Sequence, residues 1–411
     1  MTSVTFLGVI ESLKQMDFQN ADILDLFHAV RLEWGAIYLD DKVQISEHNN
    51  PENFLVRANI KDSKITKWQS GPACTPDVLE EILRLAKEMR APIAHSHVLS
   101  RIMFSQRELL GRWRFKEHFQ IVPCVHEIKV GAGLDWHNEV SANLDDSDPH
   151  GPPYPFLLEV SVPKISNPWL QMQIGMKQLD YSEHMLCTFV KGVSNTLLWP
   201  NERQWTALKS KDDSGIEYHL LHSGIGTQRG GQYDSWTEWS GKDTPVFEGN
   251  DYIDSLLPYR LDELVVPDDL GQLFEIYFRM NERLKRKFSR AAYFFTLGQK
   301  LRSSFDLAVL NFAIAVECLL EADESERCSN CGKDKVGPTR LFRAFMDKYA
   351  VVNEPLVDRR NKLYAVRSLI AHGARSMKTD FSMFSLARDR DTPLLMEWLV
   401  RKSLVGWLRD Q

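Results

Sequence analysis

The sequence lacks several features that would place a chain of 411 residues in a special class of protein. It contains no run of eighteen apolar residues, so we expect no membrane span. Its opening residues show no basic segment followed by a long apolar stretch, so we expect no secretory signal peptide. Cysteine is scarce, with six residues of which only two are close together. This scatter excludes a disulfide framework and favours a reducing, cytoplasmic location.

An overall excess of positive charge is also missing, because the net charge is −6. The charge is nevertheless distributed unevenly. Residues 276–411 carry 25 Lys and Arg against 16 Asp and Glu, a balance of +9, whereas residues 1–275 carry 25 against 40, a balance of −15. A basic module joined to an acidic one indicates that one half binds a polyanion. The alternative is a drift of surface charge between domains that has no function.

The sequence pattern of residues 1–267 predicts an acidic, sensor-like α+β domain of unknown role. Helical spacing of apolar residues covers 22–35 and 77–90. Residues 143–155 contain four prolines and predict a subdomain joint. Strand-like patterns cover three segments: 119–130, 156–162 and 169–176.

Residues 268–411 predict a basic bundle of α-helices, so the expected fold class is α+β followed by a helical bundle. Asp268 or Asp269 can cap a helix that begins near Leu270. The helix over 306–322 is apolar nearly all round and should be the central buried one. The other expected helices are a long basic one over 278–302 and those over 340–349, 358–372 and 394–408.

The helix over 358–372 ends with Arg367, four further residues, His372 and Gly373. RNA can be cut without a metal when a 2′-hydroxyl attacks its adjacent phosphate, provided that one group moves protons and a fixed cation stabilises the developing charge. Histidine suits the first task because it titrates near neutral pH, and the planar fork of arginine suits the second. Gly373 is typical of the position just after a helix, which puts His372 in the last turn. The pair is therefore a candidate RNA-cleaving site.

One geometric point limits this interpretation. Arg367 and His372 are five positions apart, so on a regular helix their directions differ by about 140°. Three arrangements could still bring the two side chains into one site. The helix unwinds before His372, the long arginine bends round, or a second subunit completes the site.

The segment YAVRSLIAHG, which contains Arg367 and His372, resembles the Arg-x4-6-His signature of HEPN domains, specifically that of the Apea-like branch. The apolar helix with Ala315–Leu320 is similar to the helix that precedes this signature, and the basic helix over 288–297 lies where the family's first bundle helix would. The resemblance covers the helical part alone. In one HEPN branch a tyrosine two residues after the histidine accepts a nucleotide, but Ala374 occupies that position here, so this regulation is not expected.

The resemblance implies a metal-independent endoribonuclease that acts as a homodimer, with the two Arg-His motifs meeting in one cleft. The implied products carry 2′,3′-cyclic phosphate and 5′-hydroxyl ends, and catalysis requires no cofactor. HEPN ribonucleases commonly serve in phage defence or as toxins. By this resemblance the protein is an effector whose partner is RNA and whose N-terminal domain binds a phage or cellular trigger.

Glu317 lies on the nearly all-apolar helix and needs a polar partner there. It is either an auxiliary catalytic group beside Arg367 or half of a plain structural ion pair. Tyr364, Ser368 and Asn311 are further polar candidates or simple packing residues. The alternative for the whole motif is a structural arginine and a helix-capping histidine. The helical part would then be a non-catalytic HEPN module that binds RNA or a nucleotide, or only dimerises.

Cys328 and Cys331 form a CxxC followed by glycine, the shape of a zinc half-site. A full site needs two more ligands, and none follows nearby at suitable spacing. Cys74, Cys124, a distant histidine or the same CxxC of a second subunit could supply them. A structural or DNA-binding zinc element and a reduced, unliganded pair are therefore both open.

Overall fold

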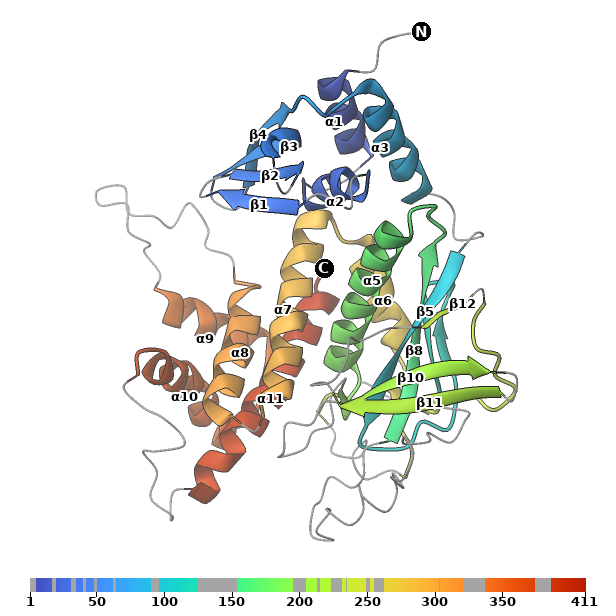
Figure 1. The fold of residues 1–411 in the computed structure, drawn as a ribbon. Helices are drawn as coiled ribbons and strands as arrows, with labels where there is room; N and C mark the ends of the chain where they lie inside the picture. The colour runs from blue at the N-terminus through green and yellow to red at the C-terminus, as the bar shows by residue number, and fades with distance from the viewer. Residues whose placement is uncertain are drawn as a thin grey trace, which may run out of the picture. The chain divides into compact units, whose positions relative to one another are not determined.

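The computed structural model shown in Figure 1 contains helices and antiparallel sheets, so the protein is an α+β protein. Its chain forms two compact units. The first combines Met1–Leu99, Ser161–Gln178 and Tyr233–Ser235, and the second combines Ser100–Val160, Leu179–Gln232 and Trp236–Gln411. The residues that the structure describes are 5–16, 20–30, 35–39, 42–47, 50–61, 64–89, 96–123, 154–194, 205–212, 215–222, 231–233, 235–248, 252–254, 262–302, 304–320, 337–373 and 386–411.

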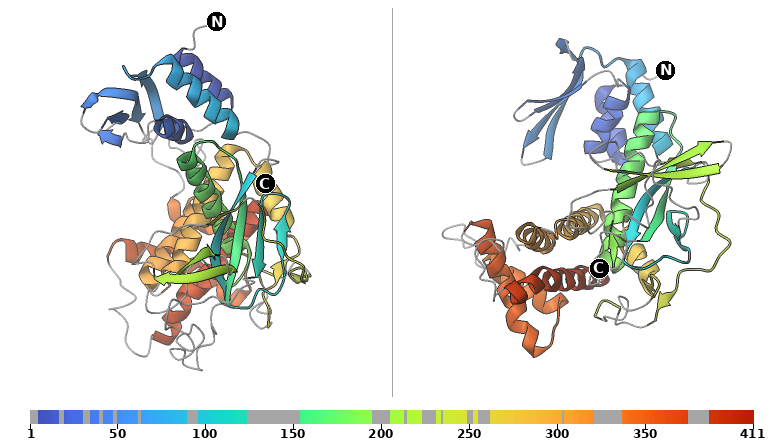
Figure 2. Two further views of the ribbon diagram at one scale, coloured as in Figure 1. Left: turned by 45° about the vertical axis from the view of Figure 1, so that its right-hand side comes forward. Right: turned by 60° about the horizontal axis from the view of Figure 1, so that its bottom comes forward.

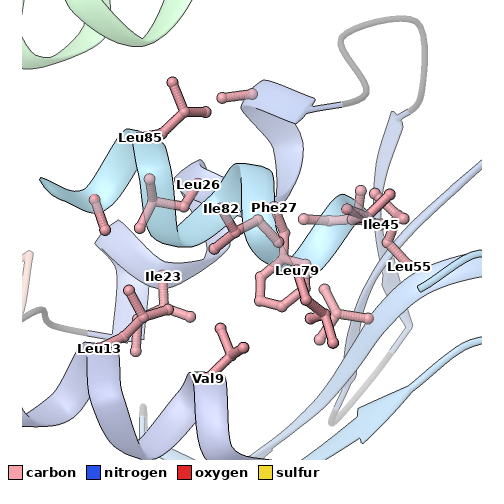
Figure 3. Packing of buried hydrophobic residues seen from close by; sticks show 14 of the residues in the cluster. Val9, Leu13, Ile23, Leu26, Phe27, Ile45, Leu55, Leu79, Ile82 and Leu85 are labelled. Carbon is pink, nitrogen blue, oxygen red and sulfur yellow. The ribbon is translucent and has the colours of Figure 1, made fainter. Parts of the chain in front are cut away.

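The first unit packs three helices against an antiparallel sheet of order β1-β2-β3-β4. The helix predicted over 77–90 is confirmed as α3. The helix predicted over 22–35 is present as α2, but α2 ends at Val30 and Gly35 already belongs to a strand. Figure 3 shows Leu79 and Ile82 of α3 in one apolar cluster with Phe27 of α2 and Ile45 of β2. Full burial of such a side chain contributes about 2 kcal/mol, so this cluster holds the unit together. The elements are α1 (Phe6–Gln15), α2 (Asn20–Val30), β1 (Gly35–Leu39), β2 (Lys42–Glu47), β3 (Asn50–Lys61), β4 (Lys64–Ser70) and α3 (Pro76–Met89).

A second sheet has the strand order β12-β5-β8-β7-β6, with β9 also paired to β5. Strands β7 and β8 run antiparallel with Ile121 opposite Leu158, which confirms the strands predicted there as far as the structure describes them. The predicted joint over 143–155 lies almost wholly outside the described residues. The strands are β5 (Ser96–Ser105), β6 (Trp113–Phe115), β7 (Phe119–Pro123), β8 (Tyr154–Pro163), β9 (Val193–Ser194) and β12 (Gly231–Tyr233); β10 (Trp205–Asp212) pairs with β11 (Gly215–His222), and β13 (Val246–Phe247) with β14 (Val266–Pro267).

The segment 169–176, predicted to be a strand, is part of the helix α5 (Pro168–Phe189). The Asn167 side-chain oxygen accepts a hydrogen bond of 2.9 Å from the Leu170 N–H and so caps the helix. Pro168 occupies the first position, where its missing N–H costs nothing. The prediction was wrong because a short alternation of apolar residues fits both periodicities, whereas the Asn-Pro start signal decides for the helix.

The helices predicted after residue 268 are present, with corrections to their bounds. The helix predicted over 306–322 ends at Glu317, and the one predicted over 394–408 already begins at Leu386. The helix predicted over 278–302 is interrupted at Met280, where ψ is 152°, and Asn281 then caps α7 by accepting a hydrogen bond of 3.0 Å from the Leu284 N–H. Helices α7 and α8 lie side by side, and α11 packs against both (Figures 1 and 2). The bounds are α6 (Leu270–Arg279), α7 (Glu282–Lys300), α8 (Phe305–Glu317), α9 (Pro338–Tyr349), α10 (Glu354–Ala371) and α11 (Leu386–Arg409).

The boundary predicted between residues 267 and 268 lies inside the second compact unit. Phe274 of α6 explains why, because its ring centroid lies 4.5 Å from that of Phe119 on β7 and 5.2 Å from that of Phe189 on α5. The first helix of the predicted bundle thus shares a core with the sheet. No helix in the described part of the chain is long and apolar enough to cross a membrane.

Candidate active site

The end of α10 carries the candidate residues. Its regular turns stop at Ala371, and the His372 N–H still donates a hydrogen bond of 3.1 Å to the Ser368 carbonyl. Gly373 follows with φ of +66°, and its N–H donates a hydrogen bond of 3.0 Å to the Ile370 carbonyl. This left-handed residue ends the helix, as predicted from the sequence. The exposed His372 therefore closes the last turn and is open to solvent.

Arg367 is joined to Glu317 at the last turn of α8. Its Nη2 donates a hydrogen bond of 3.0 Å to Glu317 Oε2, and the side chains are 23% and 26% exposed. Arg367 Nε and Glu317 Oε1 are buried and have no hydrogen-bond partner among the described residues. Nη2 is thus the nitrogen that holds Glu317, whereas Nε is closed to solvent, so a phosphate oxygen could reach Arg367 only at the outer N–H groups of its guanidinium.

Arg367 and His372 lie on opposite faces of α10. The face that carries Arg367 also carries the buried residues Arg360 and Tyr364, whereas the exposed Leu369 lies on the face of His372. This matches the separation of about 140° expected from five helical positions. The helix does not unwind before His372, so one protomer does not gather both side chains on one face of this helix.

The other polar candidates have structural contacts. Tyr364 is 8% exposed, and its ring centroid lies 4.9 Å from that of Phe342, so it packs in the core. The Arg367 guanidinium carbon lies 5.6 Å from the centroid of the same tyrosine ring, a distance at which the cation is attracted to the ring. Asn311 is buried and donates a hydrogen bond of 2.7 Å to the Leu307 carbonyl within its own helix. Ser368 is partly buried on α10.

A zinc site cannot be assembled from the part of the chain that is described, where no group of three or more His, Cys, Asp or Glu residues is placed to hold a metal ion. Cys328, Cys331 and Cys124, the candidate ligands, lie outside the described residues. Cys74 is in the first unit and is free, and burial raises the pKa of its thiol to about 11. A thiol with a raised pKa is a poorer metal ligand because the thiolate is the form that binds.

Two buried carboxylates of the second unit were missed by sequence reasoning. Glu183 of α5 is 1% exposed and pairs with Arg101 and, at 3.2 Å, with Lys300. Glu397 of α11 is 4% exposed and accepts a hydrogen bond of 3.0 Å from Gln299. Burial acts to raise the pKa of each carboxyl, but neighbouring cations outweigh it and hold both pKa values below the usual range.

Glu397 has two cationic partners. It forms ion pairs with Arg302 and, at 3.3 Å, with Arg401. The carboxylate of Glu397 is thus fully charge-compensated, which is what stabilises a buried ion. A charged residue within the apolar pattern over 394–408 was the sequence signal for it.

Comparison of the chain with protein-family models, with curated proteins and with solved structures finds no match.

Proposed function

We propose that this protein is a metal-independent endoribonuclease whose site consists of Arg367 and His372, with Glu317 as an auxiliary group. The observation that carries the proposal is the partly exposed Arg367, which Glu317 holds in place shortly before the exposed His372. A partly exposed guanidinium can bind a phosphate oxygen through its outer N–H groups, and an exposed imidazole can reach a substrate to donate or accept a proton.

The reaction is a transesterification. The 2′-hydroxyl loses its proton to a base and its oxygen bonds to phosphorus, while the bond from phosphorus to the 5′-oxygen breaks and the leaving oxygen takes a proton from an acid. His372 serves as proton donor or acceptor, and Arg367 stabilises the charge on the phosphate oxygens. The products are a 2′,3′-cyclic phosphate and a 5′-hydroxyl.

A second copy of the chain completes the site in this proposal. Two features support it: Arg367 and His372 face away from each other, and Leu369 on the His372 face of α10 is 41% exposed. In a homodimer, His372 of one protomer can approach a phosphate held by Arg367 of the other. An effector role in phage defence, with a trigger bound by the N-terminal region, is part of the proposal and follows from the resemblance alone.

Incubation of purified protein with total RNA in the presence of EDTA tests the proposal. We expect the wild type to cut the RNA and leave 2′,3′-cyclic phosphate ends, and His372→Ala to be inactive. Because His372 is exposed, this variant should keep the wild-type circular dichroism spectrum and melting temperature. If neither protein cuts, or if both cut equally, the proposal is wrong.

A non-catalytic RNA-binding or dimerisation module is the second candidate. The ion pair itself favours it, because an arginine that already has a carboxylate partner can be purely structural. In that case the wild type binds RNA or forms dimers without producing new RNA ends.

A further inference from the structure

The first half of α7 presents a basic face. Between Glu282 and Arg290 the helix has five basic residues and one acidic residue. Arg286 and Arg290, four positions apart, share one face and are exposed, whereas Phe288 is buried on the other side. Tyr293 continues the exposed face one turn later and is 44% exposed. The face thus combines fixed positive charges with an accessible aromatic ring.

The positive charge of this face is not cancelled locally. The Glu282 carboxylate pairs with Lys285 at 3.1 Å. Arg286 Nε donates a hydrogen bond of 3.2 Å to the Glu282 backbone carbonyl, which carries no net charge. Neither Arg286 nor Arg290 has an ion-pair partner within the described ranges. Two guanidinium groups therefore attract anions here.

The basic face leads toward the candidate active site. Phe295 of α7 lies 5.6 Å from Phe312 of α8, measured between ring centroids. Nearer the start of α7, the charge of Arg290 acts on the Cys318 thiol and opposes the rise in its pKa that burial causes. The two helices therefore run antiparallel, and the Arg290 end of the face adjoins the end of α8 where Glu317 holds Arg367.

We propose that the α7 face defined by Arg286 and Arg290 binds the phosphate backbone of single-stranded RNA and leads the strand to Arg367. The inference rests on the proposed function and names the path of its substrate. Guanidinium forks match phosphate oxygens in geometry and charge. The ring of Tyr293 is placed to stack on a base of the same strand, which favours a single strand over a duplex with its bases stacked inside.

Equilibrium binding of a fluorescent, unstructured RNA oligonucleotide by fluorescence anisotropy tests this inference. All proteins are full-length and carry His372→Ala, so that the RNA is not cut. The double variant Arg286→Gln/Arg290→Gln removes two cations from the face. Lys67→Gln/Lys87→Gln removes the same charge from exposed positions of the first unit and serves as the matched control. Each protein is titrated at several salt concentrations.

We expect the arginine variant to bind RNA on the order of tenfold more weakly, and its plot of log affinity against log salt to be shallower by about 1.4. The Lys67→Gln/Lys87→Gln control should bind RNA with the same affinity and salt slope as the parent His372→Ala protein. The inference is overturned if the arginine variant binds RNA with the same affinity and the same salt slope as its parent. It is also overturned if the variant loses binding to polyglutamate but not to RNA, because the face would then bind acidic polypeptides.

Failure of the inference is distinct from failure of the proposed function. If the protein with an intact His372 cuts RNA but the arginine variant binds RNA normally, the proposed binding face on α7 is wrong and the proposed nuclease function is kept. If the protein binds RNA through α7 but never cuts it, the proposed binding face is kept and the proposed nuclease function is wrong.

Discussion

The guanidinium of Arg367 donates a hydrogen bond of 3.0 Å to the carboxylate of Glu317 and thereby ties α10 to the end of α8. The second carboxylate oxygen and the Arg367 Nε are buried without a partner among the described residues. Glu317 is thus both the support of the arginine and a competitor for any phosphate that approaches it. The two roles can be separated by experiment.

Replacing Glu317 with glutamine should strengthen RNA binding several-fold, because the variant removes the anion that competes for Arg367 while keeping a hydrogen-bond acceptor. The free energy of unfolding should change by less than about 1 kcal/mol, since the ion pair is partly exposed. Fluorescence anisotropy in the His372→Ala background measures the affinity. Glu354→Gln, an exposed change of equal charge at the start of α10, is the control. Weaker binding by Glu317→Gln alone would show that Glu317 supports the arginine more than it competes.

Gly373→Ala should shift the end of α10 and lower the melting temperature. A Cβ at Gly373 meets nothing within 4 Å, so the cost of about 1 kcal/mol comes only from its φ of +66°. Gly337→Ala is the matched control, because a Cβ there also meets nothing within 4 Å and its φ is −71°. Thermal melts and RNA cleavage are measured for both. Equal effects would mean that the left-handed backbone does not hold His372 in place.

Glu397 should make the protein sensitive to acid. Its pKa is lower in the folded protein than in the unfolded chain, where a glutamate titrates near pH 4.3. Its contribution to stability is therefore complete above that pH and is lost as the pH falls through the lower, folded value. Glu397→Gln should cost about 3 kcal/mol at pH 7, because Arg302 and Arg401 lose their counter-charge, and this difference should shrink in acid. Urea unfolding at pH 7 and pH 3.5 measures it, and a constant difference would refute the argument.

Lys191 should destabilise the fold at neutral and acidic pH. The residue is 4% exposed, and burial lowers the pKa of its ammonium to about 7, with a smaller contribution from the charge of Arg401. Between that value and the usual 10.5 the unfolded chain binds more protons, so stability rises with pH through this window. Lys191→Met should therefore raise the melting temperature at pH 6, with a gain that declines toward pH 10. A gain that does not depend on pH would point to packing instead.

Local signals in the sequence located several helices. The apolar spacing located α3, and Gly373 marked the end of α10. The spacing of five positions from Arg367 to His372 was enough to predict that on a regular helix they face different ways, because helical geometry depends only on neighbours within a few residues. The candidate site was therefore proposed from sequence, but its partner Glu317 remained one of several possibilities.

Tertiary structure decided what local patterns leave open. Arg401 reads in the sequence as one more basic residue of an amphipathic helix. It is 1% exposed and donates to the carbonyls of Cys187, Thr188 and Val190 at the end of α5, at 2.7, 2.8 and 3.2 Å. The pairing of Arg367 with Glu317 is of the same kind. Periodicity and capping report on residues within one or two turns, whereas these contacts join segments far apart in the chain and depend on how whole elements pack.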